Sequence, residues 1–502
     1  MIVAAVAATT PVVADSRPLF SMEKTNVFLT GATGVMGFAT LGELEKHFDC
    51  FNVCLLVRDS KKNRKKLAPY LDSHNVRIVW GDLLNPEDVA RALGDATVVL
   101  HMGGMVSPAA DYHPEATMKV NVGGTANVIA AIKNSPLADE IKLVYIGSVA
   151  QMSNRNEPFH WGRTGDPLQA ASFDFYGLSK ILAERMVAES GLRRWVSLRQ
   201  SGILHPGLFM KAFDPIAFHI PLRGVLEWTT LEDSAVLMRR LSEDDIAESF
   251  WNKFYHIGSG RQYRLSNYDF VRLTMEAVKC PPPEKIFEPS WFATRNFHGI
   301  WFDDSDILEE LVGFRKNIPL EDYFRSLASK APWWTRLAPL APAPVIKYVM
   351  KSVANKKPLG PLYWLKSSHC EDKINAFFGS RVQQKKIPDW PAWNLSSPSS
   401  KSIRLSHGYD ESKPLESLDL EDMRKAAAFR GGRLLSEQME RGDLFTPLEW
   451  ECGRNHRFMA TPNLILKGGH WCPECVRLNW TEKPVDSPFL NQLKREVQTE
   501  VD

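Results

Sequence analysis

Short apolar runs alternate with stretches of helical spacing over the first 150 residues. Five runs are almost continuously hydrophobic, as in strands buried on both faces of a parallel sheet: NVFLT, FNVCLLV, VRIVW, TVVLHM and IKLVYIGS. Between them lie amphipathic stretches such as FATLGELEKHF, PEDVARAL and VNVGGTANVIAAIKN. The pattern predicts an α/β fold built on a doubly wound parallel sheet, the Rossmann architecture.

The chain divides into segments of different composition. Residues 25–315 carry the alternating pattern, and their length suits one Rossmann domain with its substrate-binding segments. Proline, tryptophan and lysine are frequent after it, and a polar stretch that we expect to be flexible follows, so a helical appendage and linker are predicted over 316–440. We predict a disordered extension over 1–24, a cysteine-rich zinc module over 441–480 and a tail over 481–502.

Bulk composition excludes some classes of protein. The 502 residues are 44% hydrophobic and 24% charged, which is globular composition, and the net charge of +2 gives no reason to expect a nucleic-acid partner. No run of about 18 apolar residues is present, and the N-terminal stretch lacks the basic start of a signal peptide. The seven cysteines, three of them clustered, suit a reduced compartment and a metal site. We expect a cytoplasmic protein.

A glycine-rich turn follows the first predicted strand. In GATGVMG the glycines stand at Gly31, Gly34 and Gly37, where the chain must turn tightly, admit a pyrophosphate and pack a helix closely on a strand. The helix that follows presents free N–H groups to the phosphates. The turn therefore predicts a dinucleotide site, with further contacts from Thr33, Val35 and Met36.

The end of the second strand bears on the choice of cofactor. A carboxylate there binds the ribose 2′-hydroxyl of NAD, whereas an arginine accommodates the 2′-phosphate of NADP. The chain places Arg58 first, followed by further basic residues, and this favours NADPH. Asp59 leaves NADH open, and a solvated basic helix face is the alternative interpretation of the cluster.

A tyrosine and a lysine stand four residues apart in DFYGLSKILAERM. The spacing places Tyr176 and Lys180 on one face of a predicted helix, where the lysine charge would lower the pKa of the phenol. Ser148 ends the strand IKLVYIGS and can hydrogen-bond a reacting carbonyl, although such a serine is often a turn residue. Asn121 is placed to hold Lys180 through a water, although an isolated asparagine is usually a cap.

Together these motifs resemble the extended short-chain dehydrogenase/reductase family, and within it the 3β-hydroxysteroid dehydrogenase branch. The marks include GATGVMG, GDL, HMGG, VNVGGT, IGSVA, YGLSK and LRQSGILHP. The resemblance implies Tyr176 as catalytic acid/base, Lys180 as its activator and ribose ligand, Ser148 as carbonyl donor and Asn121 as relay residue. It also implies cofactor contacts from Asp82 and Leu83 at the adenine and from Gly103, and a homodimer is usual for the family. HMGG and Gln200 depart from the commoner pattern.

The C-terminal cysteines have the spacing of a zinc site. The run ECGRNHRFMATPNLILKGGHWCPEC contains C-x3-H followed by C-x2-C, and four ligands of this kind close a tetrahedral structural site. We predict Cys452, His456, Cys472 and Cys475 as ligands, with His470 as the substitute for His456. The module resembles zinc-ribbon or treble-clef modules, and a reduced cluster without metal is the alternative.

Aromatic residues indicate the kind of substrate. Trp333, Trp334, Tyr348, Tyr363 and Trp364 are interleaved with lysines and arginines, as in segments that contact a membrane interface. The prolines break the amphipathic period, which favours a helical appendage packed on the core, and peripheral membrane contact stays open. We expect NADPH-dependent reduction of a carbonyl or conjugated enone of a hydrophobic, steroid-like substrate, with a small hydrophobic ketone or alcohol as the partner. The alternatives are a sugar-nucleotide epimerase or dehydratase, and a non-catalytic protein that senses NADP.

Overall fold

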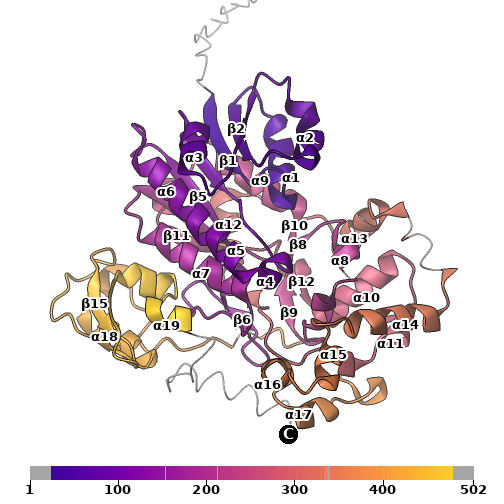
Figure 1. Cartoon of the computed structure of the whole chain (residues 1–502). Coiled ribbons are helices and arrows are strands. Elements are labelled where there is room, and N and C mark those ends of the chain that lie inside the picture. Colours follow the sequence, from indigo (N-terminus) through magenta and orange to yellow (C-terminus); the bar gives the residue numbers. More distant parts are fainter. Residues whose placement is uncertain are drawn as a thin grey trace, which may run out of the picture.

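A computed structural model describes residues 24–478, apart from 153, 212, 334, 336–339, 395 and 402. The predictions for the N-terminal extension and the C-terminal tail, and the aromatic Trp334, therefore lie outside the described residues. Residues from about 24 to 315 form a Rossmann domain and a substrate lobe, onto which the later segments pack (Figure 1).

Seven strands of the described chain form one parallel sheet in the order β11-β7-β5-β4-β1-β2-β3. The sequence predicted five of these strands, and the doubly wound fold is confirmed. The strands are β1 (Thr25–Thr30), β2 (Phe51–Val57), β3 (Val76–Trp80), β4 (Val98–His101), β5 (Lys142–Ser148), β7 (Arg194–Gln200) and β11 (Lys253–Ile257).

Helices cover both faces of the sheet because its strands are apolar on both sides. One face is covered by α3 (Pro86–Leu93), α6 (Gly124–Lys133) and α7 (Phe175–Ala188). The other is covered by α1 (Val35–Glu45), α2 (Lys61–Leu67), α9 (Leu231–Arg240) and α12 (Ser305–Val312). Short helices α4 (Ala109–Tyr112) and α5 (Pro114–Met118) and a π-helical turn, Lys119–Gly123, precede α6.

The substrate lobe is built from short strand pairs and helices beyond the carboxyl ends of the sheet strands. Its pairs are β6 (Trp161–Gly162) with β13 (Trp301–Phe302), β8 (Ile203–Leu204) with β10 (Thr229–Thr230), and β9 (Val225–Glu227) with β12 (Arg264–Ser266). Its helices are α8 (Leu208–Lys211), α10 (Asn267–Ala277) and α11 (Pro283–Ile286).

The helical appendage packs on this lobe and does not form a separate unit. Met350 and Ala354 share one hydrophobic cluster with Phe218 and Ile286 of the lobe. The inner side of these helices therefore packs on the lobe. They are α13 (Leu320–Ser329), α14 (Ala343–Ala354), α15 (Pro361–Lys366), α16 (Glu371–Phe378) and α17 (Arg381–Lys385).

The polar linker lies against β6 and its flanking residues in the substrate lobe. His407 is buried and its Nε2 lies 2.8 Å from Asp166 Oδ1, and the carbonyl oxygen of Ser399 accepts hydrogen bonds from the rings of His160 and Trp161. The expectation of flexibility rested on composition alone. It missed these contacts because they join residues more than 200 positions apart in the sequence.

A C-terminal module, residues 420–478, packs beside α7 (Figure 1). A three-stranded sheet forms its centre, with Trp450 fully buried. Its elements are α18 (Leu420–Phe429), β14 (Arg433–Leu434), β15 (Leu448–Glu451), β16 (Arg457–Ala460), a π-helical turn (Asn463–Lys467) and α19 (Pro473–Leu478). The module thus begins before residue 441, because α18 and β14 supply part of its core.

A buried ion pair holds this module to the sheet. Glu184 of α7 and Arg199 of β7 have fully buried side chains, with Arg199 Nη2 2.6 Å from Glu184 Oε1. Ser197 Oγ donates to the same carboxylate at 2.6 Å, and the ring of His470 lies 2.9 Å from it. The module therefore supplies part of the hydrogen bonding that a buried charge requires.

Removing one member of this pair should destabilise the protein strongly. Glu184→Ala leaves Arg199 buried without its charge partner, and we expect a loss of about 3–5 kcal/mol. Glu248→Ala, which removes the exposed partner of Arg194, is the matched control and should cost less than about 1 kcal/mol. Denaturant unfolding of both variants measures this difference, and equal losses would contradict a structural role for the buried pair.

Candidate active site

A large cavity of about 1430 Å³ runs along the carboxyl ends of the sheet strands. It extends from the glycine turn of β1 and α1, past Ser148, Tyr176 and Lys180, into the substrate lobe as far as Met350 of α14. A ligand crevice at this edge is the general arrangement for open α/β sheets. The cavity therefore joins the predicted cofactor residues to the predicted catalytic residues.

The glycine turn is shaped for a close approach of backbone and ligand. Gly31 has φ +75°, and a Cβ at Gly37 would lie 2.3 Å from the Gly31 carbonyl oxygen. Helix α1 begins after Gly34 without a side-chain cap or an acidic residue in its first turn. Its first N–H groups and the positive end of its dipole therefore suit a pyrophosphate. Thr33, Val35 and Met36 also line the cavity.

The basic cluster after β2 lies at the same end of the cavity. Asp59 is occupied by Arg64, whose Nε and Nη2 donate to its two carboxylate oxygens at 2.6 and 2.8 Å. Arg58 and Lys62 line the cavity and have no ion-pair partner within the described part of the chain. Asp59, the carboxylate that could bind the ribose hydroxyl of NADH, is thus engaged in an ion pair. Arg58 and Lys62 remain available to bind a phosphate.

The other predicted cofactor contacts line the same cavity. Asp82 and Leu83 line the cavity beside the glycine turn, and so does Gly103, whose N–H donates to Thr30 Oγ1 at 2.8 Å. His101, in the unusual HMGG run, is buried between Thr30 and Thr125 at 2.8 and 3.0 Å. Burial and then the charge of Lys180 lower the pKa of His101 to about 3, so it is a neutral structural residue.

Ser148, Tyr176 and Lys180 come together in the cavity wall. Ser148 ends β5, and Tyr176 and Lys180 stand one turn apart on α7. The side chain of Asp174 caps the start of this helix by accepting a hydrogen bond from Gly177 N at 2.6 Å. Ser148 and Tyr176 share a side-chain hydrogen bond. Lys180 Nζ donates to the Ile146 carbonyl oxygen at 2.7 Å and lies 6.0 Å from the centre of the Tyr176 ring.

The expectation that Lys180 lowers the pKa of Tyr176 is not met. Burial raises the pKa of the phenol to about 12, which outweighs the hydrogen bond with Ser148, and the lysine is directed toward a backbone carbonyl. Burial also lowers the pKa of Lys180 to about 8, although the negative charge of Glu184 acts to raise it. Tyr176 is thus a protonated phenol at neutral pH, which makes it a proton donor.

Asn121 is buried in the π-helical turn before α6, a feature that often marks functional sites. Its Oδ1 accepts from Met105 N at 2.7 Å, and its Nδ2 donates to Met105 O at 3.0 Å and Ser179 Oγ at 2.8 Å. Asn121 thereby joins the loop after β4 to α7, and its water-mediated link to Lys180 stays a prediction.

Three titratable residues near Tyr176 were missed by the sequence analysis. His298 lines the cavity, and its Nδ1 lies 2.7 Å from Asp174 Oδ2. Asp111 accepts a long hydrogen bond from Tyr176 N. Burial and the negative charge of nearby Asp174 raise the pKa of Asp111 to about 6. The motif DFYGLSK contains a signal for Asp174, because an aspartate there can cap the helix that follows. His298 has no such local signal, because it is 124 residues away from Asp174 in the chain.

The substrate end of the cavity is largely apolar. Arg155 also lines it, but its side chain is fully buried and pairs with Asp166 at 3.1 Å. The apolar lining side chains are Ile216, Phe218, Ile220, Leu226, Trp228, Leu265, Phe270, Val271, Met275, Phe287, Phe292, Phe297 and Met350. This composition is that of a site for an apolar ligand.

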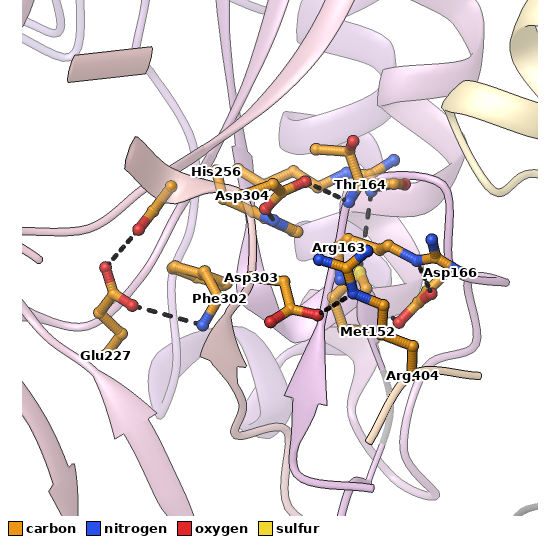
Figure 2. A network of polar contacts seen from close by, with 12 residues as sticks. Met152, Arg163, Thr164, Asp166, Glu227, His256, Phe302, Asp303, Asp304 and Arg404 are labelled. Atoms are coloured by element: carbon orange, nitrogen blue, oxygen red, sulfur yellow. Dashed lines mark hydrogen bonds and ion pairs between the residues drawn. The ribbon is translucent and has the colours of Figure 1, made fainter. Parts of the chain in front are cut away.

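Buried polar contacts fix the lobe to the sheet (Figure 2). Asp304 accepts from Thr164 N at 2.7 Å and pairs with His256 Nδ1 of β11 at 2.8 Å. Glu227 of β9 accepts from Ser305 Oγ at 2.6 Å and from Phe302 N at 3.3 Å. Because these carboxylates are satisfied within the protein, the cavity wall that they support has a defined position.

Cys452, His456, Cys472 and Cys475 come together in the C-terminal module, with their ligand atoms all within 4.8 Å of one another. The distances are 3.6 Å for Cys452 Sγ–Cys475 Sγ and 3.5 Å from His456 Nδ1 to each of Cys472 Sγ and Cys475 Sγ. Tetrahedral zinc with Zn–S bonds of about 2.3 Å requires sulfur–sulfur edges of about 3.8 Å. The four residues therefore fit zinc. His470, the predicted substitute ligand, instead contacts Glu184.

Comparisons with known proteins agree with this fold. Residues 27–201 match the model of the NAD dependent epimerase/dehydratase family, so this part of the chain is similar to that family. The solved dTDP-glucose 4,6-dehydratase of Bacillus anthracis, in complex with NAD, aligns with a TM-score of 0.50 over 61% of this chain and 96% of its own, at 14% identity. That likeness shows the fold alone.

Two curated relatives are similar to parts of the chain. The 3 beta-hydroxysteroid dehydrogenase type 7 of Rattus norvegicus is 35% identical over 121 residues, which is 24% of this chain and 35% of the relative. The UDP-N-acetylglucosamine 4,6-dehydratase (inverting) of Campylobacter jejuni is 29% identical over 109 residues, 22% of this chain and 32% of the relative. The chain thus spans about a third of the length of the curated relatives that it matches.

Proposed function

We propose that the protein is an NADPH-dependent oxidoreductase that reduces a carbonyl, or a conjugated enone, of a hydrophobic, steroid-like substrate. The observation that carries the proposal is the continuous cavity, in which Ser148 and Tyr176 stand between the glycine turn and an apolar substrate arm. The similarity to a hydroxysteroid dehydrogenase supports the same class of substrate.

The chain's own groups suit the proton half of a reduction. When bound, the nicotinamide supplies the hydride. Ser148 is placed to donate a hydrogen bond to the substrate oxygen, and the protonated Tyr176 phenol delivers a proton to that oxygen as negative charge develops on it. The ammonium of Lys180, 6.0 Å from the ring, stabilises the negative charge left on the phenolate.

The choice of NADPH rests on the charges around the ribose end of the cavity. Arg64 neutralises Asp59, whereas Arg58 and Lys62 line the cavity without an acidic partner among the described residues. A 2′-phosphate is therefore met by two cations, and the hydroxyl of NADH has no available carboxylate from this strand end. The arrangement favours NADPH over NADH.

A sugar-nucleotide substrate is less well supported. Such a substrate carries a diphosphate, which is usually bound by arginine or lysine side chains. In the described lining of the substrate arm, Arg155 is the one arginine or lysine, and its guanidinium is buried against Asp166. The intact Ser148, Tyr176 and Lys180 arrangement also favours catalysis over the sensing of NADP without turnover.

NADPH oxidation by the purified full chain tests the proposal directly. The panel holds ketosteroids, other lipophilic ketones and enones, and UDP- and dTDP-sugars, with NADH as a parallel cofactor. We expect turnover with a lipophilic carbonyl and NADPH, and a loss of at least about 100-fold in Tyr176→Phe, which lacks the proton donor. Conversion of sugar nucleotides alone, or tight NADPH binding without any turnover, would refute the proposed reaction.

The rate of reduction should fall as the pH rises through about 8. Reduction requires the charged Lys180, whose pKa burial lowers to about 8, while Tyr176, with a pKa raised to about 12, stays protonated throughout. The pH profile of kcat between about pH 6 and pH 10 measures this effect. In Lys180→Arg the decline should move above this range, and a rate that rises through pH 8 would contradict the assignment.

We propose that the four-residue Cys/His cluster holds one structural zinc ion. Such an ion would close the module that presents His470 to Glu184 on α7, and four protein ligands leave no position for substrate. The module is then a support for the helix that carries Tyr176 and Lys180.

Loss of one ligand should release the metal and weaken the module. Cys475→Ser is expected to abolish the single equivalent of zinc found by elemental mass spectrometry and to lower the thermal midpoint, because metal binding contributes folding free energy. Cys50→Ser, at an exposed free cysteine, is the control and should change neither value. A wild-type chain purified without zinc and fully stable to chelators would contradict the site.

A further inference from the structure

Helix α14 is apolar on two opposite sides. Met350 and Ala354 point inward, where they are buried, and Met350 lines the substrate arm of the cavity. On the outer side Val345, Tyr348 and Val349 are exposed, with Tyr348 at 76%. A surface helix normally presents polar residues to water, so this outer side requires an explanation.

Two further exposed apolar side chains precede the helix in the sequence. Leu340, two residues before the N-cap Pro342, is 79% exposed, and Trp333 of the same segment is exposed as well. Tyrosine and tryptophan are enriched where one end of a side chain is apolar and the other is wet, as at the headgroup level of a bilayer. We call the exposed residues Leu340, Val345, Tyr348 and Val349, with Lys351, Lys356 and Lys357, the α14 surface.

The charge of this segment has one sign. Residues 331–370 contain six lysines and arginines and no aspartate or glutamate. Lys347 pairs with Glu288, while Lys351, Lys356 and Lys357 are exposed and form no ion pair within the described chain. Such a surface is complementary to anionic lipid headgroups, which attract each basic residue near the membrane.

We propose that the α14 surface docks on a membrane that contains anionic lipid. The apolar side chains enter the headgroup region and the lysines bind phosphates. A second copy of the chain fits less well, because a twofold contact would bring the same three lysines together. No described helix is long and apolar enough to cross a membrane, so contact is at the surface.

The inference that the α14 surface docks on a membrane rests on the proposed function, because that function gives the docking a purpose. Lipophilic carbonyl compounds partition into bilayers, and the inner side of α14 is a wall of the cavity that would receive them. Docking through the outer side places that wall next to the membrane. The proposal therefore adds a partner, an anionic lipid surface, to the proposed reductase.

Vesicle co-sedimentation of the full chain tests the docking. Vesicles of phosphatidylcholine alone are compared with vesicles that also contain phosphatidylglycerol, at low and high salt. We expect binding to the anionic vesicles that weakens with salt, and at least about tenfold weaker partitioning for Lys351→Glu/Lys356→Glu/Lys357→Glu. Val345→Ser/Tyr348→Ser/Val349→Ser should lower the bound fraction on both kinds of vesicle.

Matched controls alter exposed residues elsewhere. Lys133→Glu/Arg424→Glu/Lys425→Glu and Leu71→Ser/Ile307→Ser/Leu311→Ser change the same kinds of side chain and should bind like the wild type. Wild-type binding no stronger to anionic than to neutral vesicles, unchanged binding of the α14 variants, or self-association in solution that those variants abolish would overturn the proposal. NADPH turnover without vesicles reports separately on the proposed reaction.

Discussion

The buried ion pair between Glu184 and Arg199 is the interaction on which the rest of the structure depends. Both side chains are fully buried, and such a pair is tolerated only when its remaining hydrogen-bonding groups are satisfied. Ser197 and the ring of His470 contact the carboxylate, and Arg199 donates to the carbonyl oxygens of Thr164 and Gly468. The sheet, the segment after β6 and the C-terminal module thus meet at this ion pair.

That carboxylate stands on the helix that also carries the proposed catalytic pair, Tyr176 and Lys180. Glu184 lies one turn after Lys180, which lies one turn after Tyr176, and Asp174 caps the start of the same helix. The position of α7 is therefore set at both ends, by a cap beside the cavity and by a buried charge under the module. The contacts of the C-terminal module thus support the helix that carries Tyr176 and Lys180.

Much of the fold was predictable because its cause is local. Strands buried on both faces appear as continuous apolar runs, the Gly31 to Gly37 turn has few alternatives, and the Tyr176 to Lys180 spacing follows from helix geometry. The Cys/His cluster was also predictable, because ligand spacing in the sequence carries over into the site.

The parts that escaped prediction depend on contacts distant in sequence. His298 joins Asp174 across 124 residues, and the linker is anchored where His407 meets Asp166, 241 residues away. The pKa of Tyr176 is raised because burial of the phenol outweighs its hydrogen bond with Ser148. The Y-x-x-x-K spacing does not show how deeply the phenol is buried. The same applies to α14, because its sequence does not show which of its two apolar sides lines the cavity.

Isotope transfer from labelled cofactor tests the central claim most directly. The chain is incubated with a lipophilic ketone and NADPH that carries deuterium at the transferable position of the nicotinamide, and the product is examined by mass spectrometry. Hydride reduction predicts an alcohol, or a saturated ketone, with one deuterium bound to carbon. Unlabelled product, or label that remains on the cofactor while a sugar nucleotide is converted, would contradict the account.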